Sequence, residues 1–181
     1  MIKKIFFSAL SIFLCIQSYD LFWFLWSRDE MSWLALVICA FLLNLFVSGV
    51  FAFLSFAYPI SKLFTNTFYT NVKATRIELL YKRLGVKYFK ILLMLFYWGR
   101  TKHRKEFFSG GKGGIAALDF RSKQAEIGHF LPFVVLLLMA VFLFVHGDIS
   151  LSIFIFVFNL VGNFFPILLQ RKLRVRLQFL R

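Results

Sequence analysis

The sequence is poor in the residues from which many soluble domains build their sites and cross-links. It contains only two cysteines, three prolines and eight acidic residues in 181 positions. Both cysteines, Cys15 and Cys39, lie within apolar stretches, so the pattern indicates neither a disulfide framework nor a zinc site. No internal repeat is visible, which argues against the duplicated halves of many transporters. We expect a chain without a metal site or a bound cofactor.

Apolar residues are the abundant ones: 60% of the chain is hydrophobic, and 27 residues are phenylalanine. A soluble domain averages roughly 45–50% apolar residues. The excess is concentrated in four runs that each carry at most one Asp, Glu, Lys or Arg, at positions 5–26, 32–58, 129–146 and 149–170. Each run has about the ~17–25 residues that a helix needs to cross a bilayer. We therefore predict an all-α membrane protein with four transmembrane helices in a single integral domain, residues 1–181.

The net charge of +14 is placed almost entirely on one side of these predicted helices. Every basic residue except Arg28 precedes the first run, lies between the second and third, or follows the fourth in a basic tail, residues 171–181. Basic loops remain in the cytoplasm, so the distribution predicts cytoplasmic N- and C-termini. This placement explains the charge without a nucleic-acid partner, and we expect membrane lipids to be the partners instead.

The predicted cytoplasmic segment, residues 60–128, contains an amphipathic pattern. From Arg76 to Leu95 apolar residues recur at helical spacing and basic residues occupy another stripe, which predicts a helix lying in the membrane interface. The uncharged residues 91–98 would span only ~12 Å as a helix, so they are a candidate re-entrant stretch rather than a fifth span. Residues 100–114 are basic and rich in glycine but lack the phosphate-loop pattern, so we expect a surface loop there.

Polar residues gather where the third predicted helix begins and the fourth ends. Glu126 and His129 are three residues apart, which places them on one helix face. A second stripe consists of Asn159, Asn163, Pro166, Gln170 and Arg174, which are spaced by four, three, four and four residues along the fourth predicted helix. Arg171 lies beside this stripe. Both groups reach the cytoplasmic boundary, and ionisable groups near the membrane core usually have a function. Interhelical hydrogen bonds, topology anchors and a local ion pair of Glu126 are the structural alternatives.

Two of these segments resemble a known family. Q-A-E-I-G-H-F (Gln124 to Phe130) and N-F-F-P-I-L-L-Q-R-K-L-R-V-R (Asn163 to Arg176) are similar to elements of the glycosyl-4,4'-diaponeurosporenoate acyltransferases, small bacterial membrane proteins of staphyloxanthin synthesis. The order of basic loop, apolar helix and terminal motif agrees over roughly residues 81–177. Gln124, Lys172 and Leu173 depart from the family pattern. The resemblance implies transfer of an acyl group to a lipid or glycolipid, with a carotenoid glycoside as one example, in a bacterial cell membrane.

The resemblance and the chemistry of acyl transfer together suggest a role for each polar residue. His129 would be the general base, with Glu126 orienting its imidazole. Asn163 or Gln170 would donate to the oxyanion that forms on the acyl carbonyl. Arg171 and Arg174 would bind the phosphates of an acyl-CoA or acyl carrier, which is the expected co-substrate.

Other functions fit the same residues. A non-enzymatic membrane subunit could use the polar stripe to bind a partner membrane protein or a second copy of itself. A different membrane transferase, such as a methyltransferase, could also end in asparagine, proline and arginine. A transporter fits least well, because Asp20 is the one Asp, Glu, Lys or Arg within the four runs and offers little pathway for a substrate.

Overall fold

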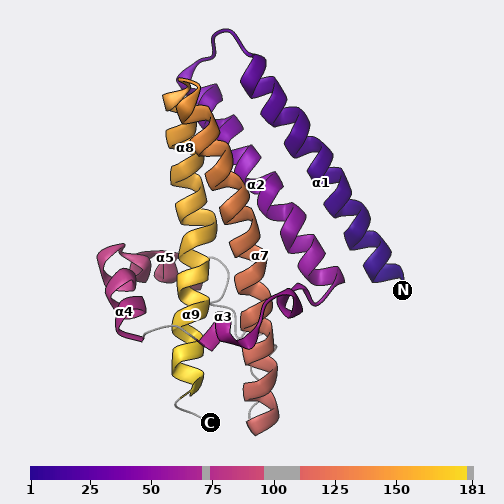
Figure 1. Ribbon diagram of the computed structural model, residues 1–181, viewed down its shortest axis with the longest axis vertical. Coiled ribbons are helices and arrows are strands. Elements are labelled where there is room, and N and C mark those ends of the chain that lie inside the picture. The colour runs from indigo at the N-terminus through magenta and orange to yellow at the C-terminus, as the bar shows by residue number, and fades with distance from the viewer. Residues whose placement is uncertain (71–73, 96–110, 179–181) are drawn as a thin grey trace. The chain divides into compact units, whose positions relative to one another are not determined.

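The computed structural model describes residues 1–70, 74–95 and 111–178, and the elements among them are all helical (Figure 1). Four stretches are long and apolar enough to cross a membrane, and they lie at Ile2–Ser27, Trp33–Ala57, Gly114–Val145 and Ile149–Leu177. These stretches confirm the predicted all-α fold with four candidate membrane spans. The chain divides into two compact units: the first is Met1–Ile60 with Gly128–Phe164, and the second is Ser61–Ile127 with Phe165–Arg181.

The first unit contains a hairpin of two helices, α1 (Ile2–Ser27) and α2 (Trp33–Ala57). The buried residues of α1 recur every seven positions, at Ser11, Ser18 and Leu25. Ser11 Oγ donates to the carbonyl of Val50 at 2.9 Å, and a Cβ at Gly49 would lie only 2.5 Å from the Leu14 side chain. Small residues therefore let the two backbones approach closely, as is usual between membrane helices.

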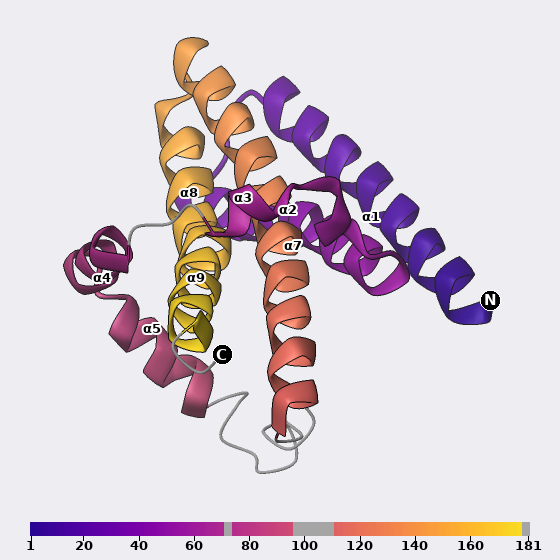
Figure 2. The same ribbon diagram turned by 60° about the horizontal axis from the view of Figure 1, so that its bottom comes forward.

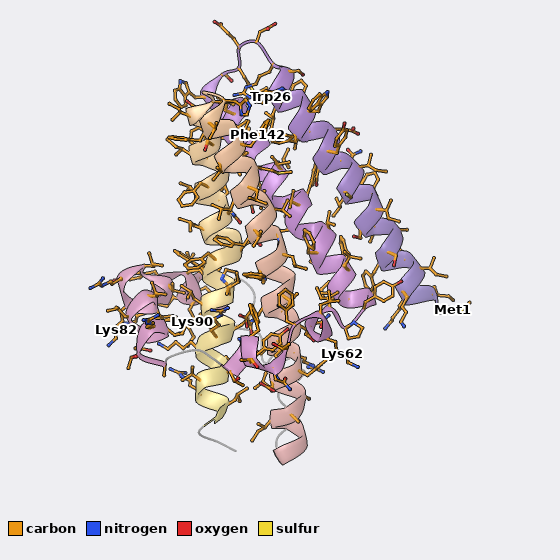
Figure 3. The ribbon with its side chains drawn as sticks, in the orientation of Figure 1. Met1, Trp26, Lys62, Lys82, Lys90 and Phe142 are labelled. Atoms are coloured by element: carbon orange, nitrogen blue, oxygen red, sulfur yellow. The ribbon has the colours of Figure 1, made fainter. Side chains whose placement is uncertain are left out.

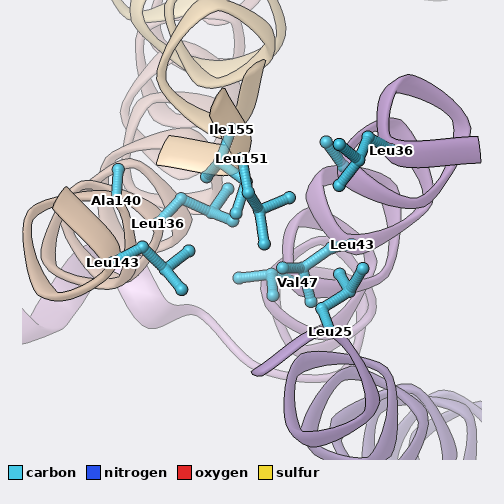
Figure 4. Close-up of a cluster of buried hydrophobic side chains, with 10 residues drawn as sticks. Leu25, Leu36, Leu43, Val47, Leu136, Ala140, Leu143, Leu151 and Ile155 are labelled. Atoms are coloured by element: carbon cyan, nitrogen blue, oxygen red, sulfur yellow. The ribbon is translucent and has the colours of Figure 1, made fainter. Parts of the chain in front are cut away.

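The apolar core of the first unit joins α1 and α2 to α8 (Ile149–Asn159) and to the apolar part of α7 (Gly111–Val145). Figure 4 shows the buried side chains that meet there, among them Leu25, Leu43, Leu136, Leu143 and Leu151, each of which is fully buried. Since lipid tails are as apolar as leucine, this cluster stabilises the bundle chiefly through close van der Waals packing.

An ion pair and aromatic rings close one end of the first unit. Arg28 donates to Asp148 Oδ2 at 2.8 Å, and the other carboxylate oxygen of Asp148 accepts from the N–H of Leu151 at 3.3 Å, which caps α8. Trp26 and Phe142 lie side by side at this end, with ring centroids 5.0 Å apart (Figure 3). Asp148 thus stabilises both a helix terminus and the end of the hairpin.

The second unit begins within the short helix Ile60–Leu63. It contains the short helices α3 (Asn66–Thr70), α4 (Ala74–Arg83) and α5 (Val86–Leu93), the polar half of α7, and α9 (Phe165–Gln178). Both α4 and α5 pack against α9 (Figures 1 and 2). The sequence predicted one helix from Arg76 to Leu95, but the structure breaks it at Gly85, whose φ of 64° requires the left-handed conformation. The interfacial position of this segment stays a prediction.

The helices continue beyond the runs that the apolar pattern marks. Helix α7 begins at Gly111, inside the stretch expected to be a surface loop, and α9 continues to Gln178 through most of the predicted basic tail. Apolar composition marks only the part of a helix that suits hydrocarbon, whereas the backbone can continue as helix in water. Residues 96–110, which include most of that expected loop and the end of the re-entrant stretch, lie outside the described residues.

Candidate functional site

The fourth membrane helix contains a π-helical turn, Leu160–Phe164, between α8 and α9. A proline follows the turn: Pro166 has no N–H and cannot donate to the carbonyl of Gly162, four residues earlier. That carbonyl is therefore available to a side chain. Single π turns of this kind occur frequently at functional sites.

A chain of amide hydrogen bonds surrounds the π turn. Asn159 Nδ2 donates to the backbone carbonyl of Phe133 in α7 at 2.9 Å, and Asn163 Nδ2 donates to Asn159 Oδ1 at 3.1 Å. Ser48 of α2 lies 3.0 Å from Asn163 Nδ2 and 3.1 Å from Asn163 Oδ1. Both asparagines are fully buried, so α2, α7 and the fourth helix are joined by polar contacts inside an otherwise apolar unit.

The same chain determines how His129 is held. His129 Nδ1 lies 3.3 Å from Asn163 Oδ1. A backbone carbonyl can only accept, so the Phe133 carbonyl fixes the orientation of Asn159, and Asn159 in turn fixes that of Asn163. Asn163 therefore presents its oxygen to the ring, and in the neutral imidazole the proton is on Nδ1 while Nε2 carries the lone pair. Gly162, which directly precedes Asn163 in the π turn, also lies beside the ring.

A second cluster, in the second unit, is centred on Glu126. Its carboxylate is fully buried: one oxygen accepts from Arg171 Nε at 2.6 Å, and the other is paired with Arg174. Arg174 also donates to Ser122 Oγ at 3.3 Å, and Ser122 donates to the backbone carbonyl of Gln170. The side chain of Arg174 is 5% exposed and that of Arg171 is 25% exposed.

Two rings of α3 lie against these arginines. The Arg174 guanidinium is 5.4 Å from the Tyr69 ring centroid, and that of Arg171 is 5.4 Å from the ring of Phe68. Tyr69 donates its hydroxyl proton to the carbonyl of Ser61 at 2.7 Å. Burial, followed by the nearby Glu126 charge, raises the pKa of Tyr69 to about 12, so the phenol stays neutral.

The arginine cluster carries an excess of positive charge. Two guanidinium groups face one carboxylate, and Arg174 Nε has no hydrogen-bond partner among the residues that the structure describes. A buried donor without a partner is costly, so a negatively charged or carbonyl-bearing ligand near Arg174 would be stabilised.

The predicted site residues thus fall into two groups. His129 and Asn163 meet in the first unit, and Glu126, Arg171 and Arg174 meet in the second, with the Gln170 backbone beside them. In each unit a residue of α7 contacts residues of the fourth helix. The orienting partner of His129 is Asn163, whereas we had expected Glu126 in that role.

Several polar residues near these clusters were not anticipated: Asn44, Ser48, Ser122 and Tyr69. Asn44 and Ser48 are four residues apart on α2, a helical pair of polar side chains in an apolar run. This spacing was the signal that could have found them. Ser122 and Tyr69 lie in polar sequence, where no pattern distinguishes them from their neighbours.

Comparison with known proteins gave one match. The sequence model of the family described as glycosyl-4,4'-diaponeurosporenoate acyltransferase (CrtO) matches residues 65–181, which is well over half of the chain. The match includes Glu126, His129 and the asparagines and arginines of the fourth helix, but not α1 or α2. No curated protein and no solved structure matched.

Proposed function

The chain belongs to the glycosyl-4,4'-diaponeurosporenoate acyltransferase family, and on that premise we propose how it acts. It moves a fatty acyl group from an acyl-CoA or acyl-carrier thioester to a hydroxyl group of a lipid or glycolipid, at the cytoplasmic face of a bacterial cell membrane. One observation carries the catalytic part of this proposal: a buried chain of amides holds His129 with Nδ1 on Asn163, which leaves Nε2 as the base.

The reaction has two steps, and His129 moves one proton in each. The acceptor oxygen attacks the thioester carbonyl carbon while Nε2 of His129 takes the hydroxyl proton, and the carbonyl π pair moves onto oxygen. The tetrahedral intermediate then collapses, the C–S bond breaks, and His129 returns the proton to the leaving thiolate. An ester and a free thiol result. Asn163 accepts from Nδ1 in both steps and keeps the ring oriented, which is the task of the carboxylate in a catalytic triad.

The arginine cluster supports recognition of the donor. Glu126 neutralises only one of the two guanidinium charges, so Arg171 and Arg174 together favour an anion such as a phosphate of coenzyme A or of a carrier arm. Arg171 is the more exposed of the two and is the residue that we expect to touch the donor. Glu126 then acts by holding both arginines in place.

The distribution of basic residues supports a cytoplasmic site, because thioester donors do not cross the bilayer and basic segments remain inside. The acceptor would reach the site from the membrane, where α1 and α2 expose apolar side chains. A carotenoid glycoside is one acceptor of this chemical type.

The test is acyl transfer by the purified full-length protein in lipid nanodiscs. Acyl-CoA and acyl-carrier protein are supplied in separate arms with a bacterial lipid extract, and mass spectrometry detects lipids that gain one acyl group. His129→Ala should lower the rate by roughly 10²–10⁴-fold, the usual contribution of a general base. His146→Ala is the matched control, because His146 directly follows the same helix and its ring nitrogen contacts the carbonyl of Phe142 rather than the amide chain.

A second pair of variants tests donor recognition. Arg171→Ala should raise the KM for the donor roughly 10- to 100-fold, the equivalent of about 1.5–3 kcal/mol for a hydrogen bond to a charged group. Arg176→Ala, an exposed position on the same helix, removes the same charge and should leave KM nearly unchanged. Equal activity of His129→Ala and wild type would exclude this mechanism. Absence of transfer in every arm, with co-purification of a larger membrane complex, would favour a non-enzymatic subunit.

A further inference from the structure

Asn44 is a buried polar residue in the middle of α2 whose donor has no partner. The side chain is 6% exposed, and Nδ2 has no hydrogen-bond partner within the described part of the chain. An unsatisfied amide in an apolar membrane unit is unfavourable, and replacement by an apolar residue of similar size would remove that cost. A role in folding therefore does not explain this asparagine.

The position of Asn44 connects it to the His129 cluster. A Cβ built on Gly162 would lie 3.0 Å from Asn44 Oδ1, so the side chain is directed at the π turn, at the glycine that precedes Asn163, the partner of His129. Ser48, one helical turn along α2, contacts Asn163. Asn44 and Ser48 thus present two polar groups from α2 to the same turn that holds the imidazole, and only the donor of Asn44 is uncommitted.

Acyl transfer needs such a donor. The carbonyl oxygen of the thioester becomes negatively charged when the acceptor oxygen attacks, and preorganised N–H groups stabilise that oxyanion. The amide N–H groups of Asn163 are committed to Asn159 Oδ1 and Ser48, so Asn163 orients the base and has no free donor for this task.

We propose that Asn44 is a catalytic residue of the acyl transfer, with Nδ2 donating a hydrogen bond to the oxyanion of the tetrahedral intermediate. This inference rests on the proposed function. It adds a residue of the second membrane helix, which lies outside the family match, to a site otherwise built from the third and fourth. The proton still moves between the acceptor hydroxyl, His129 Nε2 and the leaving thiolate, and Asn44 transfers no proton.

The experiment compares activity with stability in the same nanodisc assay. Asn44→Leu keeps the number and branching of the side-chain heavy atoms and removes the donor. We expect kcat to fall about 100-fold or more with KM for the donor within about threefold, because the hydrogen bond forms fully only in the intermediate. The thermal unfolding midpoint should stay equal to that of the wild type or rise. Asn44→Ala should give the same loss of kcat, and it serves as the second variant in case Asn44→Leu does not fold.

Ser152→Ala is the matched control. Ser152 Oγ donates to the Ala140 carbonyl at 2.7 Å between α8 and α7, so its loss removes a satisfied buried hydrogen bond. We expect this variant to unfold at lower temperature with unchanged kcat, the reverse of Asn44→Leu. If the wild type is active and Asn44→Leu keeps its kcat, the inference about Asn44 is refuted while the proposed function is not. If kcat falls in both Asn44 variants only as far as the amount of folded protein falls, the inference about Asn44 is also refuted. A wild type without transfer in any arm refutes the proposed function and this inference together.

Discussion

Neutralising Glu126 tests whether its carboxylate is the buried counter-ion of two arginines. Glu126→Gln retains the shape of the side chain but leaves two guanidinium groups without an anion. Glu126 is fully buried and the side chain of Arg174 is only 5% exposed, so water cannot replace the lost partner. Breaking a buried pair in this way costs about 3–5 kcal/mol of unfolding free energy. We expect a loss in that range, most of it from Arg174, because Arg171 is 25% exposed.

Unfolding is measured in mixed detergent micelles, with tryptophan fluorescence as the signal. Glu78→Gln is the control: it makes the same chemical change at an exposed carboxylate that is bonded to Lys172 at 2.9 Å, and it should cost far less stability than Glu126→Gln, because water solvates the partner that is left. A double variant, Glu126→Leu with Arg174→Met, should recover most of the stability, because the most buried pair is removed together and the one charge that loses its partner, Arg171, is partly exposed. If Glu126→Gln costs no more than the Glu78 control, the reasoning about a buried counter-ion is wrong.

Three further predictions concern single features. Gly85→Ala should cost about 1–2 kcal/mol, because φ at this position is 64°, and Gly85→Asn should cost less in the same unfolding titration. Burial raises the pKa of Tyr69 to about 12. The stability that the neutral phenol contributes is therefore complete below pH 10 and is lost as the pH rises through 12. An ultraviolet difference titration of wild type against Tyr69→Phe should show the phenol ionising with a midpoint near pH 12. Arg28→Gln and Asp148→Asn should show a coupling energy of about 0.5–1 kcal/mol in a double-mutant cycle, and a coupling near zero would mean that the 2.8 Å contact adds no stability.

The four membrane helices could be predicted from the sequence because long apolar runs have few alternative structures in a bilayer. Their ends could not. Gly111 to Ile127 is rich in glycine and charged residues and still helical, and nothing in its composition distinguishes that helix from a surface loop. The break at Gly85 was also missed, because one glycine within an amphipathic pattern is compatible with a continuous helix.

The candidate site residues were found by spacing along each helix, but their pairing was not. An ideal helix places Glu126 beside His129, and this suggested that they act together. The arginines of the fourth helix engage Glu126 instead, and Asn163 engages His129. A π turn cannot be detected from the 3.6-residue period of an α-helix, so Gly162 was not recognised as part of the site. Asn44 was missed because its one signal is the four-residue spacing to Ser48, and two polar residues in an apolar run are more often read as helix packing.

Helix α7 is longer than a bilayer is thick. Its 35 residues extend over about 52 Å at 1.5 Å per residue, whereas the hydrocarbon layer measures about 30 Å. Roughly 20 Å must therefore stand among headgroups or in water, and the charged residues Asp119, Arg121 and Lys123 show that it is the first half that does so. The first half of α7, which belongs to the second unit and carries Ser122 and Glu126, would therefore meet headgroups or water rather than lipid tails.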